Sequence, residues 1–414
     1  MTNPTDDSEL YKPDGARAWI RLAISLALST LGGVGLWSVV VVLPEIQTEF
    51  GVDRSNASLP FTAMLMGFAV GQVIMGKVAD RFGIVIPLLI GAVSLALGYI
   101  AASYAQSLWQ FALAHALLIG MCGSSVTFAP LVADVSHWFL RRRGIAVAIV
   151  ASGNYLAGTI WPPIMQYGVE AYGWRPTHFA VGLICLITIP PLALLLRRRP
   201  AMDDTPAPAS SVSSNRRVTA PPAVIQTLLV IAGLACCVAM AMPQVHIVAL
   251  CVDLGYGATS GAVMLSLMLG FGVVSRLASG FIADKIGGVG TLVLGSALQC
   301  LALILYLPFE GLNQLYLISA LFGLSQGGIV PSYALIIRDY FPAREAGTRM
   351  GMVLTATILG MALGGWISGE IFDLTGSYEA AFLNGIAWNI LNLAIALWFL
   401  FGGKIINKQR TLQA

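Results

Sequence analysis

Arg276 is the residue of this sequence whose type and setting most clearly predict chemistry. It lies in the second half of an apolar stretch, Met264 to Gly288, eight residues before Asp284. Eight residues of helix rise roughly 12 Å, which in a hydrocarbon layer of roughly 30 Å brings the guanidinium nearly to the midplane. At that depth it keeps its proton and must face protein or a water-filled cavity, where an anion can compensate it. Because its planar fork of donors matches a carboxylate best, we expect Arg276 to bind one.

The alternative for Arg276 is a structural role, as a buried ion pair or through contacts with backbone carbonyls. No acidic residue lies within one helical turn of it on the same stretch, which favours the functional interpretation. Other residues predicted to lie near the same depth could line an apolar cavity around this anchor, although each could also be ordinary packing. The candidates for direct substrate contact are Arg276, His115, Tyr333, Tyr155, Gln72 and Trp37.

A proton that travels with the anion would lower the cost of enclosing it, because the loaded cavity is then nearly neutral. Three residues could take that proton: His115, His246 and Asp253. Histidine titrates near neutral pH, but His115 could equally be a hydrogen-bonded link between helices. His246 follows Pro243, which favours a structural or gating role. Asp253 ends an apolar run and could also be simply solvated.

Composition identifies the elements that must position these residues. The chain is 57% hydrophobic and 10% charged, with a mean hydropathy of +0.80, whereas a soluble domain carries about a quarter charged residues. The long apolar runs of the sequence predict an all-α membrane protein with twelve transmembrane helices. The predicted spans are 19–44, 57–78, 84–106, 108–134, 144–168, 177–196, 222–250, 259–282, 289–308, 312–337, 347–370 and 380–402.

The basic residues predict the orientation of these spans. If the N-terminus is cytoplasmic, only Arg54 and Arg175 among the 23 Lys and Arg fall on the outer side, and Arg276 lies within a span. This bias places both termini in the cytoplasm. It suits a bacterial inner membrane or a eukaryotic plasma membrane, and the short loops favour the former.

The chain repeats itself at an offset of about half its length. The turn from Gly76 to Gly83, with Asp80, reappears from Gly280 to Gly287 with Asp284, an offset of 204 residues. Aromatic pairs at Trp138 and Tyr340 repeat at an offset of 202. Two pseudo-symmetric six-helix bundles follow, with Gln72 at the position equivalent to Arg276. The expected segments are a cytoplasmic N-terminal tail (1–18), an N-terminal bundle (19–196), a cytoplasmic linker (197–221), a C-terminal bundle (222–403) and a cytoplasmic C-terminal tail (404–414).

Charged residues gather at the predicted cytoplasmic ends of the spans. We expect Asp134 and Asp339 to pair with Arg81 and Lys285, or with the run Arg141 to Arg143. Such pairs would hold the cytoplasmic side closed and rearrange when it opens. The predicted latch comprises Asp80, Arg81, Asp134, Arg141, Arg142, Asp284, Lys285 and Asp339.

The 6+6 plan and the paired turns GKVADRFG and GFIADKIG resemble the major facilitator superfamily. Within it, the chain resembles the monocarboxylate transporters. The stretch Trp138 to Gly153, WFLRRRGIAVAIVASG, follows that family's signature of an aromatic residue, Phe, a basic run and small residues. Asp14 to Trp19 follows a second signature in part. Arg276 matches the family's substrate-anchoring arginine, whereas Trp37 and Gly272 stand where animal members carry a lysine and an acid.

These features together predict a secondary active transporter that moves a small monocarboxylate such as lactate or pyruvate, by proton symport and alternating access. The alternatives are an organic anion exchanger, or a dicarboxylate or aromatic-acid carrier of the same fold. A non-transporting membrane sensor is a further alternative. A drug exporter is disfavoured because the stretch from Gly153 to Pro163 lacks the G-x-x-x-G-P-x-x-G-G pattern of that class.

Other classes of protein have little support in the sequence. Motifs for phosphate binding, zinc proteolysis or serine hydrolysis are absent, so we expect no enzyme, no cofactor and no metal. The six cysteines have no metal-ligand spacing. The expected partners are the anion, the proton and the lipid bilayer, without nucleic acid, and a monomer should suffice.

Overall fold

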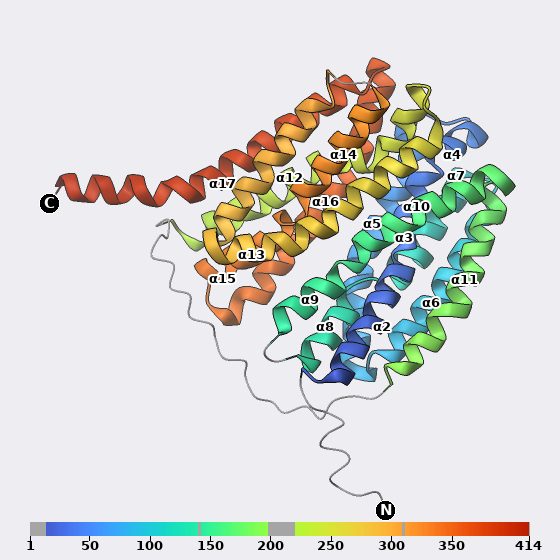
Figure 1. The fold of residues 1–414 in the computed structure, drawn as a ribbon, viewed down its shortest axis with the longest axis horizontal. Coiled ribbons are helices and arrows are strands. Elements are labelled where there is room, and N and C mark those ends of the chain that lie inside the picture. Colours follow the sequence, from blue (N-terminus) through green and yellow to red (C-terminus); the bar gives the residue numbers. More distant parts are fainter. Residues whose placement is uncertain (1–13, 140–141, 198–219, 309–310, 414) are drawn as a thin grey trace, which may run out of the picture. The chain divides into compact units, whose positions relative to one another are not determined.

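The structure, a computed structural model, describes residues 14–139, 142–197, 220–308 and 311–413. Within these ranges every regular element is a helix, as the long apolar runs predict (Figure 1). The chain forms two compact units, Met1–Glu45 with Ala63–Ser210, and Ile46–Thr62 with Ser211–Ala414. Most of the predicted linker, 198–219, lies outside the described residues.

The first unit takes its helices from the N-terminal half of the chain. Helix α6 packs along α11, and α2 and α3 pack against α10 (Figure 1). Its helices are α2 (Ala16–Gly32), α3 (Val34–Val41), the start of α4 (Leu43–Phe50), most of α5 (Arg54–Phe82), α6 (Val85–Ser103), α7 (Leu108–Leu113), the π-helix η1 (Ala114–Cys122), the 3-10 turn η2 (Gly123–Val126), α8 (Ala129–Trp138), α9 (Arg143–Ala151), α10 (Gly153–Tyr172) and α11 (Trp174–Leu195).

The second unit contains the helices of the C-terminal half and the first residues of α5. Helix α12 packs against α16 and α17, and α13 packs against α14. Pro222 opens α12, where its missing N–H costs no helical hydrogen bond. The helices are α12 (Pro222–Asp253), α13 (Gly257–Leu305), α14 (Leu312–Gln326), α15 (Ile329–Tyr340), α16 (Ala343–Thr375) and α17 (Glu379–Gln413).

Eleven helical segments of the described residues are long and apolar enough to cross a membrane. One of them, α13, is interrupted at Gly287, whose φ of 77° is not helical. The interruption falls in the predicted turn that begins at Gly280, so α13 accounts for two predicted spans. The twelve-helix prediction is therefore confirmed.

Two predicted spans are discontinuous at equivalent places in the two halves. Span four changes from π-helix to a 3-10 turn at Gly123, and span ten is interrupted at Gly327 and Gly328. In span four, the hydroxyls of Ser124 and Ser125 donate to the carbonyls of Met121 and Pro87 at 2.9 and 2.7 Å. Irregular backbone at membrane depth is tolerated where it is packed in protein or lines a cavity, and it often marks a transporter's binding site.

A substitution at Gly327 tests how closely α13 packs against the interruption of span ten. A Cβ at this position would collide with the backbone nitrogen of Arg276 and lie 2.6 Å from the carbonyl oxygen of Gly272. Backbone atoms cannot yield as a side chain can, so Gly327→Ala should destabilise the protein by about 1–3 kcal/mol. Thermal unfolding in detergent measures this effect.

Gly351→Ala is the matched control, because no heavy atom lies within 4 Å of the Cβ that it would add. It should leave the melting temperature unchanged or raise it slightly, since alanine favours the helix. Equal melting temperatures for the two variants would contradict the close packing at Gly327.

Candidate functional site

Arg276 lies on α13 where this helix contacts the interruption of span ten. Ser275 donates from Oγ to the carbonyl of Leu324 at 2.6 Å, and Gly327 lies directly against the Arg276 backbone. Only glycine permits this approach. The Arg276 side chain itself is half-buried. The backbone of the predicted anchor is therefore held by two helices, α13 and α14, while its long side chain keeps part of its surface accessible.

Buried amides surround the same part of the second unit. Gln326, the last residue of α14, accepts a hydrogen bond from Gln244 of α12 and donates to the carbonyl of Met268 at 3.3 Å. Both glutamines are almost fully buried. Because buried amides need partners, these bonds fix the end of α14 to α12 and α13. Sequence reasoning missed both glutamines, whose only signal is an amide in an apolar run.

Gln72 occupies the equivalent position in the first unit. Its Nε2 donates to the carbonyl of Ser124 at 3.1 Å, and its Oε1 accepts from the backbone nitrogen of Ala129 at 2.8 Å. One amide thus bridges the two sides of the interruption in span four. The two halves place different side chains at the same structural feature, a neutral glutamine in one and a cationic arginine in the other.

Trp37 contacts Asn154, the residue before Tyr155, in the first unit. The Trp37 indole donates to the backbone oxygen and to Oδ1 of Asn154, at 3.1 and 3.2 Å. Trp37 and Tyr155 are both buried. Asn154, which sequence reasoning passed over, therefore positions the Trp37 ring.

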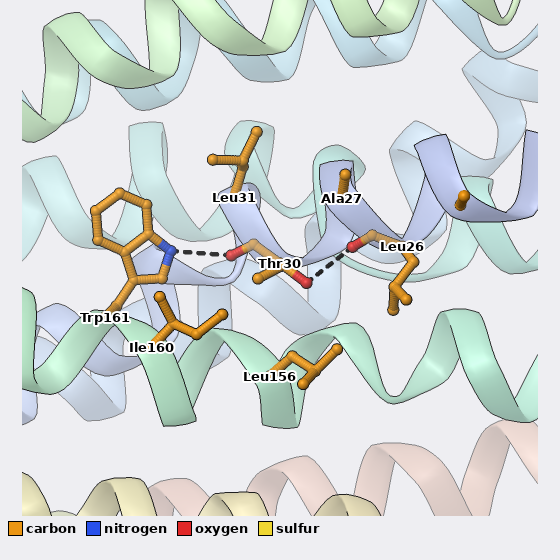
Figure 2. Close-up of a pocket in the computed structure, with 8 residues that line it drawn as sticks. Leu26, Ala27, Thr30, Leu31, Leu156, Ile160 and Trp161 are labelled. Carbon is orange, nitrogen blue, oxygen red and sulfur yellow. Dashed lines mark hydrogen bonds between the residues drawn. The ribbon is translucent and has the colours of Figure 1, made fainter.

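An open groove between α2 and α10 adds an apolar surface to the first unit (Figure 2). Its volume is about 480 Å³. The Trp161 indole donates to the carbonyl of Thr30 at 2.9 Å, and the Thr30 hydroxyl donates to the carbonyl of Leu26 at 2.8 Å. These bonds satisfy the polar groups, so the groove presents mainly hydrocarbon. It is lined by Ala23, Leu26, Ala27, Thr30, Leu31, Leu156, Ile160 and Trp161.

His115 and Tyr333 lie deeper than the other substrate candidates. His115 is fully buried, with Nδ1 2.9 Å from the carbonyl of Phe111 and its ring against Phe111. Tyr333 is also fully buried, and its hydroxyl donates to Oδ1 of Asn392 at 3.0 Å. Tyr333 therefore links α15 to α17, and the ring of His115 also packs against Tyr99 of α6 and His178 of α11. Contact of either side chain with substrate stays a prediction.

His246 and Asp253 are linked by two residues that sequence reasoning did not select. Arg54 pairs with Asp253 at 3.1 Å and donates to the Tyr378 hydroxyl at 3.0 Å, which lies 3.0 Å from Nδ1 of His246. The signal for Arg54 was present in the sequence, because it is one of few cations on the predicted outer side. The alternative of a simply solvated Asp253 is wrong.

The predicted latch is rearranged in the structure. Asp134 pairs with Arg21, with Nε and Nη2 of the guanidinium at 2.6 and 2.7 Å from its two oxygens. The expected pair of Asp134 with Arg81 is therefore wrong, and a pair with the Arg141 to Arg143 run stays a prediction, since Arg141 lies outside the described residues. Asp134 pairs with Arg21 because α2, which carries Arg21, packs against α8, which carries Asp134. Arg21 is held in place by a further bond to the carbonyl of Leu196 at 2.9 Å.

The remaining latch residues are distributed along the ends of the helices. The backbone nitrogen of Arg142 donates to Asp14 at 3.1 Å, and the Arg81 guanidinium lies over the Phe82 ring. Asp80, Asp284 and Lys285 are exposed, and Asp339 is half-buried. Arg141 lies outside the described residues. The latch role of this set stays a prediction.

The chain is similar to known proteins over most of its length. The family model described as Major Facilitator Superfamily matches residues 25–314 and 280–410. Monocarboxylate transporter 13 of Bos taurus is 28% identical over 385 residues, covering 90% of this chain and 86% of that protein. Monocarboxylate transporter 11 of Mus musculus is 28% identical over 399 residues, with 90% and 85% covered.

A fungal relative and a solved structure extend the comparison. The MFS-type transporter pynF of Aspergillus niger is 26% identical over 367 residues, covering 87% of this chain and 83% of that protein. The crystal structure of a bacterial homologue of the human lysosomal transporter Spinster superposes with a TM-score of 0.70 at 13% identity, covering 95% of this chain and 98% of that one. At this identity the likeness concerns the fold.

Glu45 carries a carboxyl group whose ionisation should affect stability. Burial raises the pKa of Glu45, a backbone hydrogen bond opposes the rise, and the nearby charge of Glu170 adds to it. A raised pKa means that the folded protein holds this proton more tightly than the unfolded chain, so stability falls as pH rises above about 4.5.

Glu45→Gln removes the charge, so it should raise the melting temperature at pH 8 and leave it unchanged near pH 4.5. Glu49→Gln, on the exposed face of the same helix, should change neither value. Melting curves at both pH values measure the effect. An unchanged melting temperature of Glu45→Gln at pH 8 would contradict the raised pKa.

Proposed function

This chain belongs to the major facilitator superfamily of membrane transporters, and from that premise we propose that it carries a small organic monocarboxylate together with a proton. The observation that carries the proposal is Arg276, a half-buried arginine that lies well inside a membrane-spanning segment, beside the interruption of span ten. A guanidinium at this depth requires an anion, and its fork fits a carboxylate with two parallel hydrogen bonds.

The charge at the site favours a monoanion. One guanidinium compensates one carboxylate, whereas a dianion would be served better by two cations. Gln72, at the equivalent position of the other half, can donate hydrogen bonds but adds no charge. The monocarboxylate transporters of cattle and mouse, both 28% identical to this chain, support the same substrate class.

A proton that binds with the anion would bring the loaded site close to neutrality and lower the cost of enclosing it. His115, His246 and Asp253 are the candidates for taking that proton. The two halves of the chain would then expose the bound pair alternately to each side of the membrane. An anion exchanger is the principal rival, because it would use the same arginine without a proton.

The placement of basic residues supports cytoplasmic termini for this multi-pass membrane protein. In that orientation Arg54 and Arg175 lie outside, and the arginine-rich turn that follows α8 lies inside. We also propose that this membrane is a bacterial inner membrane. The short loops alone support that location, because the relatives described above come from mammals and a fungus.

Uptake into proteoliposomes tests the proposal. Radiolabelled L-lactate or pyruvate should accumulate when an inward proton gradient is imposed, and Arg276→Ala should lose at least nine-tenths of this uptake. Arg276→Lys should restore little of it, because a point charge lacks the planar fork. Arg349→Ala is the matched control, since Arg349 lies near the start of α16 and pairs with Glu345 at 2.8 Å.

Four outcomes would contradict the proposal in different ways. Counterflow that ignores the pH gradient would identify an exchanger. Competition by dicarboxylates or aromatic acids, but not by lactate, would change the substrate. Saturable binding without flux would identify a sensor, and full uptake by Arg276→Ala would remove the arginine from its assigned role.

A further inference from the structure

The start of α5 is held in the second unit by an unusually dense set of contacts. The guanidinium of Arg54 is 3.1 Å from Asp253 and 3.0 Å from the Tyr378 hydroxyl, and it lies over the Phe372 ring at 4.7 Å. The backbone nitrogens of Arg54 and Ser55 donate to the two oxygens of Asp373 at 2.9 and 2.7 Å. Three segments of the second unit, the start of α5, the end of α12 and residues 372–378, therefore meet at one arginine.

The Gly365 carbonyl and the Arg54 guanidinium, at the two ends of this hydrogen-bonded chain, determine which atom donates in each bond. The carbonyl of Gly365 can only accept, so His246 Nε2, 2.8 Å away, carries a proton. In the neutral ring Nδ1 is then an acceptor. The Arg54 guanidinium can only donate, so the Tyr378 oxygen accepts from it and its O–H donates to His246 Nδ1 at 3.0 Å. Burial raises the pKa of the Tyr378 hydroxyl, which therefore remains a neutral O–H group.

Resting on the proposed proton symport, we propose that His246 Nδ1 is the atom that binds the transported proton, and that Tyr378 is the positioning residue that keeps it free to do so. An N–H bond forms at Nδ1 as an O–H bond of hydronium in the outer solution breaks, and the tyrosine O–H turns away. On the other side the N–H bond breaks and the proton returns to a water molecule as hydronium.

Proton binding at His246 and the contacts that hold Arg54 oppose each other in this geometry. An imidazolium at His246 and the guanidinium of Arg54 would share one hydroxyl oxygen, with like charges on either side of it. Asp253 and Asp373 supply the negative charge that the two cations would divide. Binding a proton therefore weakens the hold on Arg54, and release of Arg54 favours proton binding by the same amount.

The position of the cluster gives it a route to water. His246 is fully buried, but the Asp253 side chain is 33% exposed at the end of α12. Departure of Arg54 would open the way from Asp253 to the imidazole. The other buried histidines lack such a setting, since the rings of His115 and His178 pack against each other and against Phe111.

Two substitutions separate proton coupling from folding. In His246→Gln the amide can still donate to Gly365 and accept from Tyr378, but it cannot take a proton. Uptake driven by the proton gradient should fall at least tenfold, while exchange of labelled for unlabelled anion persists. Tyr378→Phe should lower gradient-driven uptake and change its pH profile, again without loss of exchange. Tyr306→Phe is the matched control, a buried tyrosine of the same unit that bonds Ser319 at 2.8 Å, and it should keep both activities.

The charged neighbours predict the sign of a second effect. Removing the cation in Arg54→Gln should move the pH midpoint of uptake upward by about one unit, because an imidazolium then forms more easily. Asp253→Asn should move the midpoint downward by a similar amount. Shifts of opposite sign are not expected from loss of packing alone.

The outcomes also separate this inference from the proposed function. If wild type and variants neither take up nor exchange any monocarboxylate, the proposed function fails. If the wild type is driven by the gradient and His246→Gln is driven equally well, the function stands and His246 is not the proton site. Midpoints that do not move in Arg54→Gln and Asp253→Asn would likewise overturn the coupling.

Discussion

The cost of placing a charge or an unpaired polar group in hydrocarbon governs this structure. An arginine near or within a span needs contacts that offset this cost. Arg21 has Asp134 and a backbone carbonyl, and Arg54 has Asp253, Tyr378 and an aromatic ring. Arg276 lies beside the interruption of span ten, and its side chain is half-buried.

The same constraint explains why the irregular backbone and the functional candidates coincide. Spans four and ten depart from regular helix at equivalent positions, and each departure is held by a residue from the second helix of its half. Gln72 bridges the interruption with its amide, and the backbone of Arg276 lies against Gly327. The repeated arrangement thus carries a polar, neutral side chain at this position in one half and a cationic side chain in the other.

The fold could be predicted largely from the sequence because hydrophobic length, charge bias and the repeated turns all depend on local residues. The turn at Gly287 and the twelve spans were accessible in this way. The contact partners of side chains on different helices could not be predicted in this way. Asp134 was expected beside Arg81 because both lie at the same predicted membrane face, but α2 packs against α8 and brings Arg21 closer. Likewise, periodicity gives no sign that Tyr378 stands between Arg54 and His246, since three distant segments meet there.

Direct binding tests the central claim that Arg276 recognises a carboxylate. Isothermal titration of the purified protein with L-lactate and with its neutral amide should give binding only for the carboxylate, at a pH where the acid is ionised. Arg276→Gln, which keeps a hydrogen-bond donor but no charge, should weaken lactate binding at least tenfold and leave the amide unaffected. Equal binding of lactate by the wild type and by Arg276→Gln would contradict the account.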